Sequence, residues 1–388
     1  MVRKTRRART RKGGRFVFSG AYGCAYRPAM KCKGETEREP NSISKLMRTK
    51  FAVEEMGMTP ILKVLDPEFK YFVYPYKMCI PEDIEPDNNV NAINSCKINI
   101  GMRVRNRNVQ KLPSSQILIF KDGGTDLSKL YVPPEDHAGY FHGFTYLFAG
   151  LVLLNNNDVI HFDIKPNNLV GLKQPTGVYL MRFIDFGLSR RMSALSNGTK
   201  EDLFFSDYSY WSFELKFLHR AVLEGIYKIT DSDIRGFYTS LEYNKESFPY
   251  WAWYNADGRP KINPTWCAVI IDDIQRGERT ISDILTSLDT FSLGRTLSEL
   301  YCRLTGHYST GPRTVEIRSN DIVKSEALKE YHIRLRDTVS IPFYKLIIIM
   351  TSPFFWNRPT VQEAYDEFKK IVLVSRAVFE SYPAAIKA

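Results

Sequence analysis

Short apolar runs separated by polar, asparagine-rich connections characterise the first third of the chain. The segments RFVFSG, YFVYPYK and QILIF are rich in β-branched and aromatic residues, which is typical of strands. After Thr125 the apolar positions recur at helical spacing, most clearly in residues 136–156, 281–304 and 359–379. The pattern therefore predicts an α+β protein in which a smaller β-rich region precedes a larger helical one.

Domain boundaries follow from this change of pattern. Paired glycines in KDGGTDL, residues 121–127, suit a flexible hinge between the two regions. The chain has 388 residues, 44% of them hydrophobic, which is enough for a sizeable core and for two or three compact units. The predicted parts are an arm at 1–15, a β-rich lobe at 16–122, a helical lobe at 123–375 and a tail at 376–388.

The net charge of +11 is concentrated at the N-terminus. Residues 1–15 carry eight Lys and Arg residues and no acid, so the rest of the chain contributes only +3. Such a block repels itself and has nothing apolar to bury, which predicts a disordered arm. A solubilising tail, a nuclear address and an arm that binds nucleic acid or an acidic partner all fit this composition. No aromatic residue precedes Phe16 to stack on bases.

Cysteine usage indicates a reducing environment. The six cysteines are Cys24, Cys32, Cys79, Cys96, Cys267 and Cys302. They are scattered without a C-x-x-C pair, so we expect neither a disulfide framework nor a zinc site. No apolar run is long enough to span a membrane, and the N-terminus lacks the apolar segment of a secretory signal. We therefore expect an intracellular protein, cytosolic, nuclear or enclosed in a particle, without membrane association.

The stretch VIHFDIKPNNLV places several chemically active side chains between apolar flanks. His161, Asp163, Lys165 and Asn168 form the pattern H-x-D-x-K-x-x-N, and Asp185 opens a D-F-G triplet soon after it. Phosphoryl transfer needs a carboxylate that orients the acceptor hydroxyl and takes its proton, and oxygen ligands that hold Mg²⁺ on a triphosphate. The apolar runs LVGLK and VYLMRFI between the two motifs predict a hairpin that holds them together.

These motifs, in this order, resemble the catalytic loop and metal-binding loop of eukaryotic-type protein kinases. The resemblance spans about residues 16–375 and implies a bilobal kinase-like fold, with a small β-rich N-lobe and a larger helical C-lobe. It implies ATP and Mg²⁺ as cofactors, with Asn168 and Asp185 as the metal ligands. Asp163 would orient the acceptor hydroxyl, and Lys165 would neutralise the charge that develops on the γ-phosphate.

Upstream, FSGAYGCAYRP resembles the glycine-rich loop that covers the phosphates of ATP. Phe18 stands where the first glycine is usual, and Ala25 stands where valine usually covers the adenine. The adenine itself is expected near residues 117–124. The resemblance implies nucleotide contacts from Gly20, Ala21, Tyr22, Gly23, Ala25 and Lys45.

Lys45 in SISKLM stands at the place of the kinase lysine that pairs with the α- and β-phosphates. Its partner should be a glutamate on the next helix, where Glu54 and Glu55 are both available. Spacing does not choose between them, and Glu55 is our working assignment. Pro60 indicates that this helix is short or that a new segment begins there.

Three further residues match the architecture of protein kinases. Glu214 in SYWSFEL resembles the glutamate that closes the activation segment, although Ser and Phe replace the usual Ala-Pro before it. Arg358 is its expected buried partner, and Asp289 is expected to hold the backbone of the catalytic loop. This set favours protein substrates over small molecules, and Lys165 resembles the choice of Ser/Thr kinases.

The interval from Glu214 to Asp289 is longer than a kinase needs, which predicts an insertion at about 218–282. Its tryptophans are Trp251, Trp253 and Trp266. They could pack against the helical lobe or form a docking face, and packing is the commoner fate of large aromatic residues.

Short stretches such as LDPEFKYFVYP also resemble the divergent protein kinases of large nucleo-cytoplasmic DNA viruses. That resemblance implies a Ser/Thr kinase that acts in the host cytoplasm or nucleus or is packaged in a virion. Two alternatives are a catalytically weak pseudokinase or scaffold, and a protein whose basic arm binds nucleic acid.

Phe162 precedes Asp163 where many regulated kinases carry an arginine that receives an activation-loop phosphate. We therefore predict that activity does not require phosphorylation of this loop, with Arg190 and Arg191 available as alternative phosphate partners. Activity assays on a variant with four alanines test this, and loss of activity would contradict it. The replaced hydroxyl residues are Ser189, Ser193, Ser196 and Thr199.

Overall fold

The computed structural model describes most of the chain and divides it into two compact units. The described residues are 15–19, 23–82, 115–195, 208–243, 247–317 and 325–382. The first unit comprises Met1–Val64 and Val73–Asp122, and the second comprises Leu65–Phe72 and Gly123–Ala388. The division after Asp122 coincides with the predicted boundary. Residues 1–14 of the basic arm lie outside the described residues.

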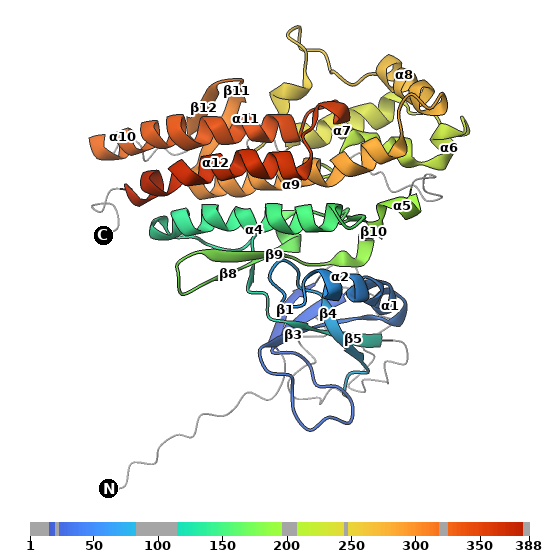
Figure 1. Ribbon diagram of the computed structural model, residues 1–388, viewed down its shortest axis with the longest axis vertical. Coiled ribbons are helices and arrows are strands. Elements are labelled where there is room, and N and C mark those ends of the chain that lie inside the picture. Colours follow the sequence, from blue (N-terminus) through green and yellow to red (C-terminus); the bar gives the residue numbers. More distant parts are fainter. Residues whose placement is uncertain are drawn as a thin grey trace, which may run out of the picture. The chain divides into compact units, whose positions relative to one another are not determined.

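The first unit is built on a five-stranded antiparallel sheet in the order β1-β2-β3-β5-β4 (Figure 1). Its central strands bury most of their side chains, among them Leu46, Ile117 and Ile119. Helix α1 contacts β3, β4 and β5. The strands are β1 (Arg15–Ser19), β2 (Gly23–Arg27), β3 (Ser42–Arg48), β4 (Pro75–Cys79) and β5 (Ser115–Lys121). The helices are α1 (Thr49–Gly57) and α2 (Thr59–Leu65), and Pro60 lies in the first turn of α2, where proline is tolerated.

The run YFVYPYK does not form the strand that its composition predicts. Only its last part lies in β4, because the Asp66 carboxylate folds the preceding backbone into a turn. It accepts hydrogen bonds from the backbone N–H groups of Lys70, Tyr71 and Phe72 at 2.8, 2.7 and 2.9 Å. Phe72 then forms an isolated bridge with Phe183, so Leu65–Phe72 belongs to the second unit and the predicted N-lobe is not continuous.

A disulfide joins Cys32 to Cys79 in the first unit. Backbone hydrogen bonds run between the two segments, from Lys33 N–H to the Ile80 carbonyl and from Glu82 N–H to the Lys31 carbonyl. This pairing brings the cysteine Cα atoms to 5.7 Å, within disulfide range. Cys24 is also disulfide-bonded. The expectation of no disulfides is therefore wrong, and the argument for a reducing compartment loses its basis.

The second unit is mainly helical. Aromatic side chains fill its core, where Phe141 lies 5.2 Å from Phe368 and 5.5 Å from Phe343 between ring centroids. Capping boxes at Thr280 and Thr360 mark the starts of two of its helices. The main helices are α4 (His137–Asn155), α9 (Ile281–Thr305), α10 (Glu326–Leu335), α11 (Ile341–Met350) and α12 (Val361–Glu380), with a π-helical turn at Arg336–Ser340.

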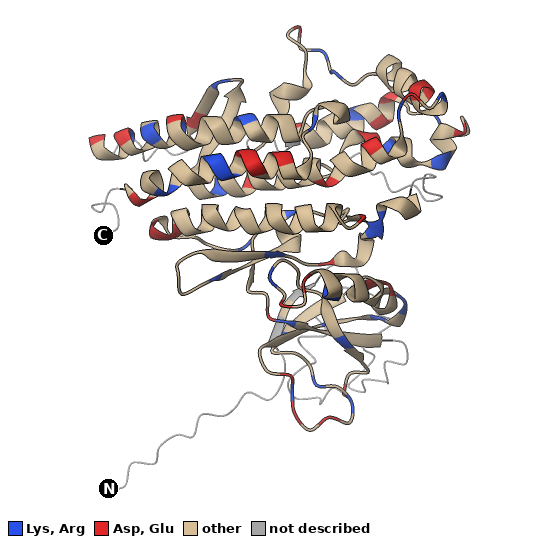
Figure 2. Ribbon diagram, in the orientation of Figure 1, with Lys and Arg blue, Asp and Glu red and all other residues tan. Residues whose placement is uncertain are grey.

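Two of these helices differ sharply in charge. Helix α4 contains no Lys, Arg, Asp or Glu, whereas α12 presents charges of both signs along its length (Figure 2). The difference matches burial, because many α4 positions are enclosed and α12 is amphipathic. Because α12 continues to Glu380, the tail predicted to begin at 376 starts inside a helix instead. Within the described part of the chain, no helix combines the length and apolarity needed to cross a membrane.

The second unit also contains several short paired strands. The predicted hairpin is present as β8 (Leu169–Lys173) and β9 (Tyr179–Phe183), with β6 (Thr125–Asp126) beside β8. Gly124 precedes β6 with φ +102°, and a Cβ there would lie 2.2 Å from the Gly171 carbonyl oxygen, so only glycine fits. The remaining strands are β7 (Val159–Ile160) paired with β10 (Arg190–Arg191), and β11 (His307–Gly311) paired with β12 (Thr314–Ile317).

The predicted insertion packs against α9. Trp253 is fully buried, with its ring 5.2 Å from Phe237 and 5.8 Å from Phe291. Trp251 and Trp266 are partly buried against the same core, which supports packing over a docking face. Its elements are α6 (Arg220–Leu223), α7 (Asp231–Tyr243), η5 (Tyr250–Trp253) and α8 (Pro264–Gln275), and η4 (Phe213–Leu218) precedes it. The short elements elsewhere are η1 (Pro134–Asp136), η2 (Pro166–Asn168), η3 (Phe186–Leu188), α5 (Met192–Leu195) and η8 (Phe355–Asn357).

The Cys32–Cys79 disulfide gives a stability prediction. The two cysteines are 47 positions apart, so replacing both with serine should lower the free energy of unfolding by about 2–4 kcal/mol. The physical reason is the freedom that the unfolded chain regains. Urea unfolding without reductant measures the loss, and reductant should abolish the difference from wild type.

Cys302→Ser is the matched control, since Cys302 is a buried free thiol. Its difference from wild type should be the same with and without reductant. An equal response of both variants to reductant would contradict the prediction.

Candidate functional site

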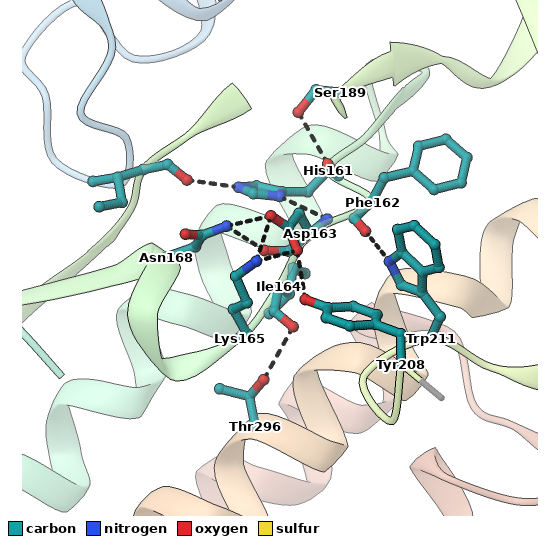
Figure 3. A network of polar contacts seen from close by, with 11 residues as sticks. His161, Phe162, Asp163, Ile164, Lys165, Asn168, Ser189, Tyr208, Trp211 and Thr296 are labelled. Carbon is teal, nitrogen blue, oxygen red and sulfur yellow. Dashed lines mark hydrogen bonds and ion pairs between the residues drawn. The ribbon is translucent and has the colours of Figure 1, made fainter. Parts of the chain in front are cut away.

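Asp163 is the centre of a hydrogen-bond network in the second unit (Figure 3). Lys165 Nζ donates to both carboxylate oxygens at 2.8 Å. Asn168 Nδ2 donates to Oδ2 at 2.7 Å and to the Asp163 carbonyl at 2.9 Å. The Tyr208 hydroxyl donates to Oδ1 at 2.7 Å. The structure thus brings together three of the residues that the sequence singled out, and adds Tyr208.

A buried carboxylate holds the backbone of this loop. Phe162 has φ +67°, a strained value for a non-glycine residue. Asp289 from α9 accepts hydrogen bonds from the backbone N–H groups of His161 at 2.6 Å and Phe162 at 3.1 Å. The Trp211 indole N–H donates to the Phe162 carbonyl. The predicted role of Asp289 is confirmed.

His161 links the loop to the D-F-G segment. Its Nδ1 lies 3.3 Å from the Asp163 backbone nitrogen, and its Nε2 lies 3.2 Å from the Ile184 carbonyl oxygen. Burial lowers the pKa of His161 to about 4, so the ring is neutral near pH 7. A neutral ring can accept at Nδ1 and donate at Nε2, which makes His161 a structural link rather than a base.

A backbone hydrogen bond joins the segments that carry Asn168 and Asp185. The Ile184 N–H donates to the Asn168 carbonyl at 3.0 Å, which places the next residue, Asp185, beside this loop. Asp185 has φ +64°. Because Asn168 donates its amide nitrogen to Asp163, its Oδ1 is the atom that can act as a ligand.

The Asn168 side-chain oxygen and the Asp185 carboxylate are ligands of the kind that Mg²⁺ prefers. This ion binds oxygen atoms and usually keeps water and substrate phosphates among its ligands. Within the described ranges, no group of three or more His, Cys, Asp and Glu side chains could hold a metal ion.

Lys45 forms its ion pair with Glu55 in the first unit. The two atoms, Nζ and Oε2, lie 2.7 Å apart, and the Glu55 side chain is only 3% exposed. Glu54 is turned away by its position on α1, with 47% of its side chain exposed and its carboxylate 4.0 Å from Lys50 Nζ. The choice that spacing left open is therefore resolved in favour of Glu55.

The glycine-rich segment supports Lys45 from the neighbouring strand. Ala25 is the Cα partner of Lys45 between β2 and β3. A Cβ at Gly23 would lie 2.9 Å from Lys45 Cγ, so this glycine leaves room for the lysine side chain. Residues Gly20, Ala21 and Tyr22 lie outside the described residues.

The predicted pair of Glu214 and Arg358 is confirmed. Arg358 Nη2 lies 2.5 Å from Glu214 Oε1, and neither side chain is exposed. Burial raises the pKa of Glu214 and lowers the pKa of Arg358, while each charge favours the other. Arg358 Nε also donates to the Ser352 carbonyl at 2.9 Å, which ties the pair to the turn before α12.

Sequence reasoning missed Tyr208 and Trp211. Both lie just before Glu214 in SDYSYWSFEL. The signal available was the cluster of three aromatic residues close to the end of the expected activation segment. Their hydrogen bonds to Asp163 and Phe162 cross a long sequence distance, so no local pattern indicates them.

The hydroxyl residues after the D-F-G motif are not equivalent. Ser189 is buried and donates to the His161 carbonyl at 3.2 Å, so its replacement disturbs the loop itself. Ser193 donates to Asp158. Ser196 and Thr199 lie outside the described residues. A phosphorylation test that keeps Ser189 and replaces the other three separates loop structure from phosphate acceptance.

Comparison with known proteins assigns no family to this chain. No protein-family model matches it, and no curated protein matches it. Any functional assignment therefore rests on the residues and contacts described above.

Asp289 gives a prediction for pH dependence. Burial raises its pKa to about 7, from about 3.9 in an unfolded chain. Its contribution to stability is therefore complete below about pH 4 and lost as pH rises towards 7, with a slope approaching ~1.4 kcal/mol per pH unit. Asp289→Asn should lack this slope. Urea unfolding of both proteins across this range measures it, and parallel pH profiles would contradict the assignment.

Proposed function

We propose that this chain is an ATP-dependent protein kinase that transfers the γ-phosphate of MgATP to Ser or Thr hydroxyls of proteins. The observation that carries the proposal is the hydrogen-bond network at Asp163. Lys165 and Asn168 both donate to the Asp163 carboxylate. Asp185 directly follows Ile184, whose N–H donates to the Asn168 carbonyl. The mixed α+β architecture, with a small sheet unit and a larger helical unit, is compatible with the bilobal fold that the motifs imply.

In the proposed reaction, Asp163 accepts a hydrogen bond from the acceptor hydroxyl and takes its proton. The acceptor oxygen forms a bond to the γ-phosphorus as the bond to the β-phosphate oxygen breaks, and ADP leaves. Lys165, already paired with Asp163, supplies positive charge beside the transferring group. Asn168 and Asp185 would hold Mg²⁺, which neutralises and orients the phosphates when bound.

Lys45 has the proposed role of contacting the α- and β-phosphates. A buried Glu55 holds the ammonium in a defined position, and the Lys45 side chain is 18% exposed. Partial exposure leaves the ammonium able to meet an anionic ligand, whereas the Glu55 carboxylate is enclosed. The pair therefore suits a lysine whose position is fixed before the nucleotide binds.

Protein acceptors are proposed because the buried Glu214–Arg358 pair and the Asp289 contacts match the protein-kinase pattern rather than that of small-molecule phosphotransferases. The resemblance to kinases of large DNA viruses adds an infected cell or a virion as the proposed location. The Cys32–Cys79 disulfide favours an oxidising environment over the reducing cytoplasm and nucleus. Residues 1–15 would serve as a binding arm for nucleic acid or an acidic partner.

Transfer of labelled γ-phosphate from MgATP to a generic basic protein, followed by phosphoamino-acid analysis, tests the proposal. Label on Ser or Thr should appear with wild type and fall by at least ~10²-fold with Asp163→Asn, the scale of one general base. Asp185→Asn should lose transfer as well, because a metal ligand is removed.

Glu55→Gln and Glu54→Gln form a matched pair on one helix. Only Glu55→Gln should lower activity, since Glu54 faces solvent beside Lys50. A folded wild type that binds nucleotide without transferring phosphate would contradict the proposal and favour a pseudokinase. The nucleic-acid alternative would be favoured if the protein bound DNA without transferring phosphate. That binding should weaken with added salt and be lost when residues 1–15 are deleted.

A further inference from the structure

The Asp163 carboxylate has no room for another donor. An ionised carboxylate offers about four lone-pair sites on two oxygens. Lys165 and Tyr208 donate to Oδ1, and Lys165 and Asn168 donate to Oδ2. These four contacts fill the hydrogen-bonding capacity of the carboxylate. An acceptor hydroxyl can therefore bind Asp163 only when one of the present donors leaves.

Two of the three donors are unsuited to leaving. Lys165 contacts both oxygens, and its departure would leave the Asp163 charge without its counter-ion. Asn168 is fixed by a second hydrogen bond to the Asp163 carbonyl and by accepting the Ile184 N–H. Both residues also belong to the short loop that Asp289 holds.

Tyr208 differs from them in chemistry and in position. Its donor is a neutral hydroxyl, the same group that a Ser or Thr acceptor would present, so exchanging one for the other keeps the hydrogen-bond type unchanged. It also comes from a different segment, distant in sequence from the catalytic loop.

The contact is built into the fold rather than made by a free surface side chain. The Tyr208 ring packs edge-on against Trp211 at 4.8 Å, and Lys165 Nζ lies 5.4 Å from its centroid. Burial and the nearby Asp163 charge raise the pKa of Tyr208, so its hydroxyl stays protonated and acts as a donor. Tyr208 therefore does not act as a base here.

We propose that the Tyr208 hydroxyl occupies the position on Asp163 that the acceptor hydroxyl needs. The acceptor must displace it before phosphate can be transferred. The inference rests on the proposed kinase function. Tyr208 would then set the minimum affinity that an acceptor needs. Only an acceptor that gains enough binding energy from contacts with the rest of its chain displaces the Tyr208 hydroxyl.

Tyr208→Phe tests this, because it removes the hydroxyl and keeps the ring that packs on Trp211. Steady-state kinetics with a basic serine peptide that wild type phosphorylates should show the acceptor KM lowered by about tenfold, the scale of one hydrogen bond to a charged group. The KM for ATP should not change. Tyr210→Phe is the matched control, since its hydroxyl donates to Glu299 instead, and its acceptor KM should equal that of wild type.

A second measurement needs no turnover. Calorimetry measures the Kd of the same peptide for the Asp185→Asn protein. Adding Tyr208→Phe to that protein should lower this Kd by a similar factor. Thermal unfolding of each variant checks that the fold is kept. An active Tyr208→Phe enzyme with an unchanged or raised acceptor KM, or with a lowered kcat alone, would overturn the inference. Absence of transfer from wild type and Tyr210→Phe alike would instead count against the proposed function.

Discussion

The Asp289 carboxylate is the constraint on which the rest of the site depends. It projects from α9, which is buried along most of its length, and accepts hydrogen bonds from the consecutive backbone N–H groups of His161 and Phe162, just before Asp163. Those bonds hold Phe162 at a positive φ that a free loop would leave. Thr296, about two helical turns further along α9, donates to the Ile164 carbonyl at 3.3 Å. The core helix therefore sets the direction in which Asp163 points.

The two buried ion pairs differ in how far their cation is exposed to solvent. In the first unit Glu55 is enclosed but Lys45 keeps part of its side chain exposed, so the cation can still meet a ligand. In the second unit neither Glu214 nor Arg358 is exposed, and the pair can only hold its segment in place. Losing one member of such an enclosed pair would leave an unpaired buried charge, which is why both are found together.

Much of the fold could be predicted from the sequence. The long helices follow from apolar periodicity and from caps such as Thr280 and Thr360, which act within one turn. The order of Asp163, Asn168 and Asp185 indicated one site, and the structure joins their segments by hydrogen bonds. These predictions succeeded because the interactions behind them act over a few residues or follow a fixed spacing.

Other features depended on packing between distant segments. The first unit pairs Cys32 with Cys79 because the backbones beside them are hydrogen-bonded, and α1 turns Glu55 rather than Glu54 towards Lys45. Tyr208 meets Asp163 across a long sequence distance. By itself, the sequence determined the helices, most strands and the order of the chemical groups, since local periodicity and spacing encode them. Only the tertiary structure decided which groups meet, because that choice depends on how separate elements pack.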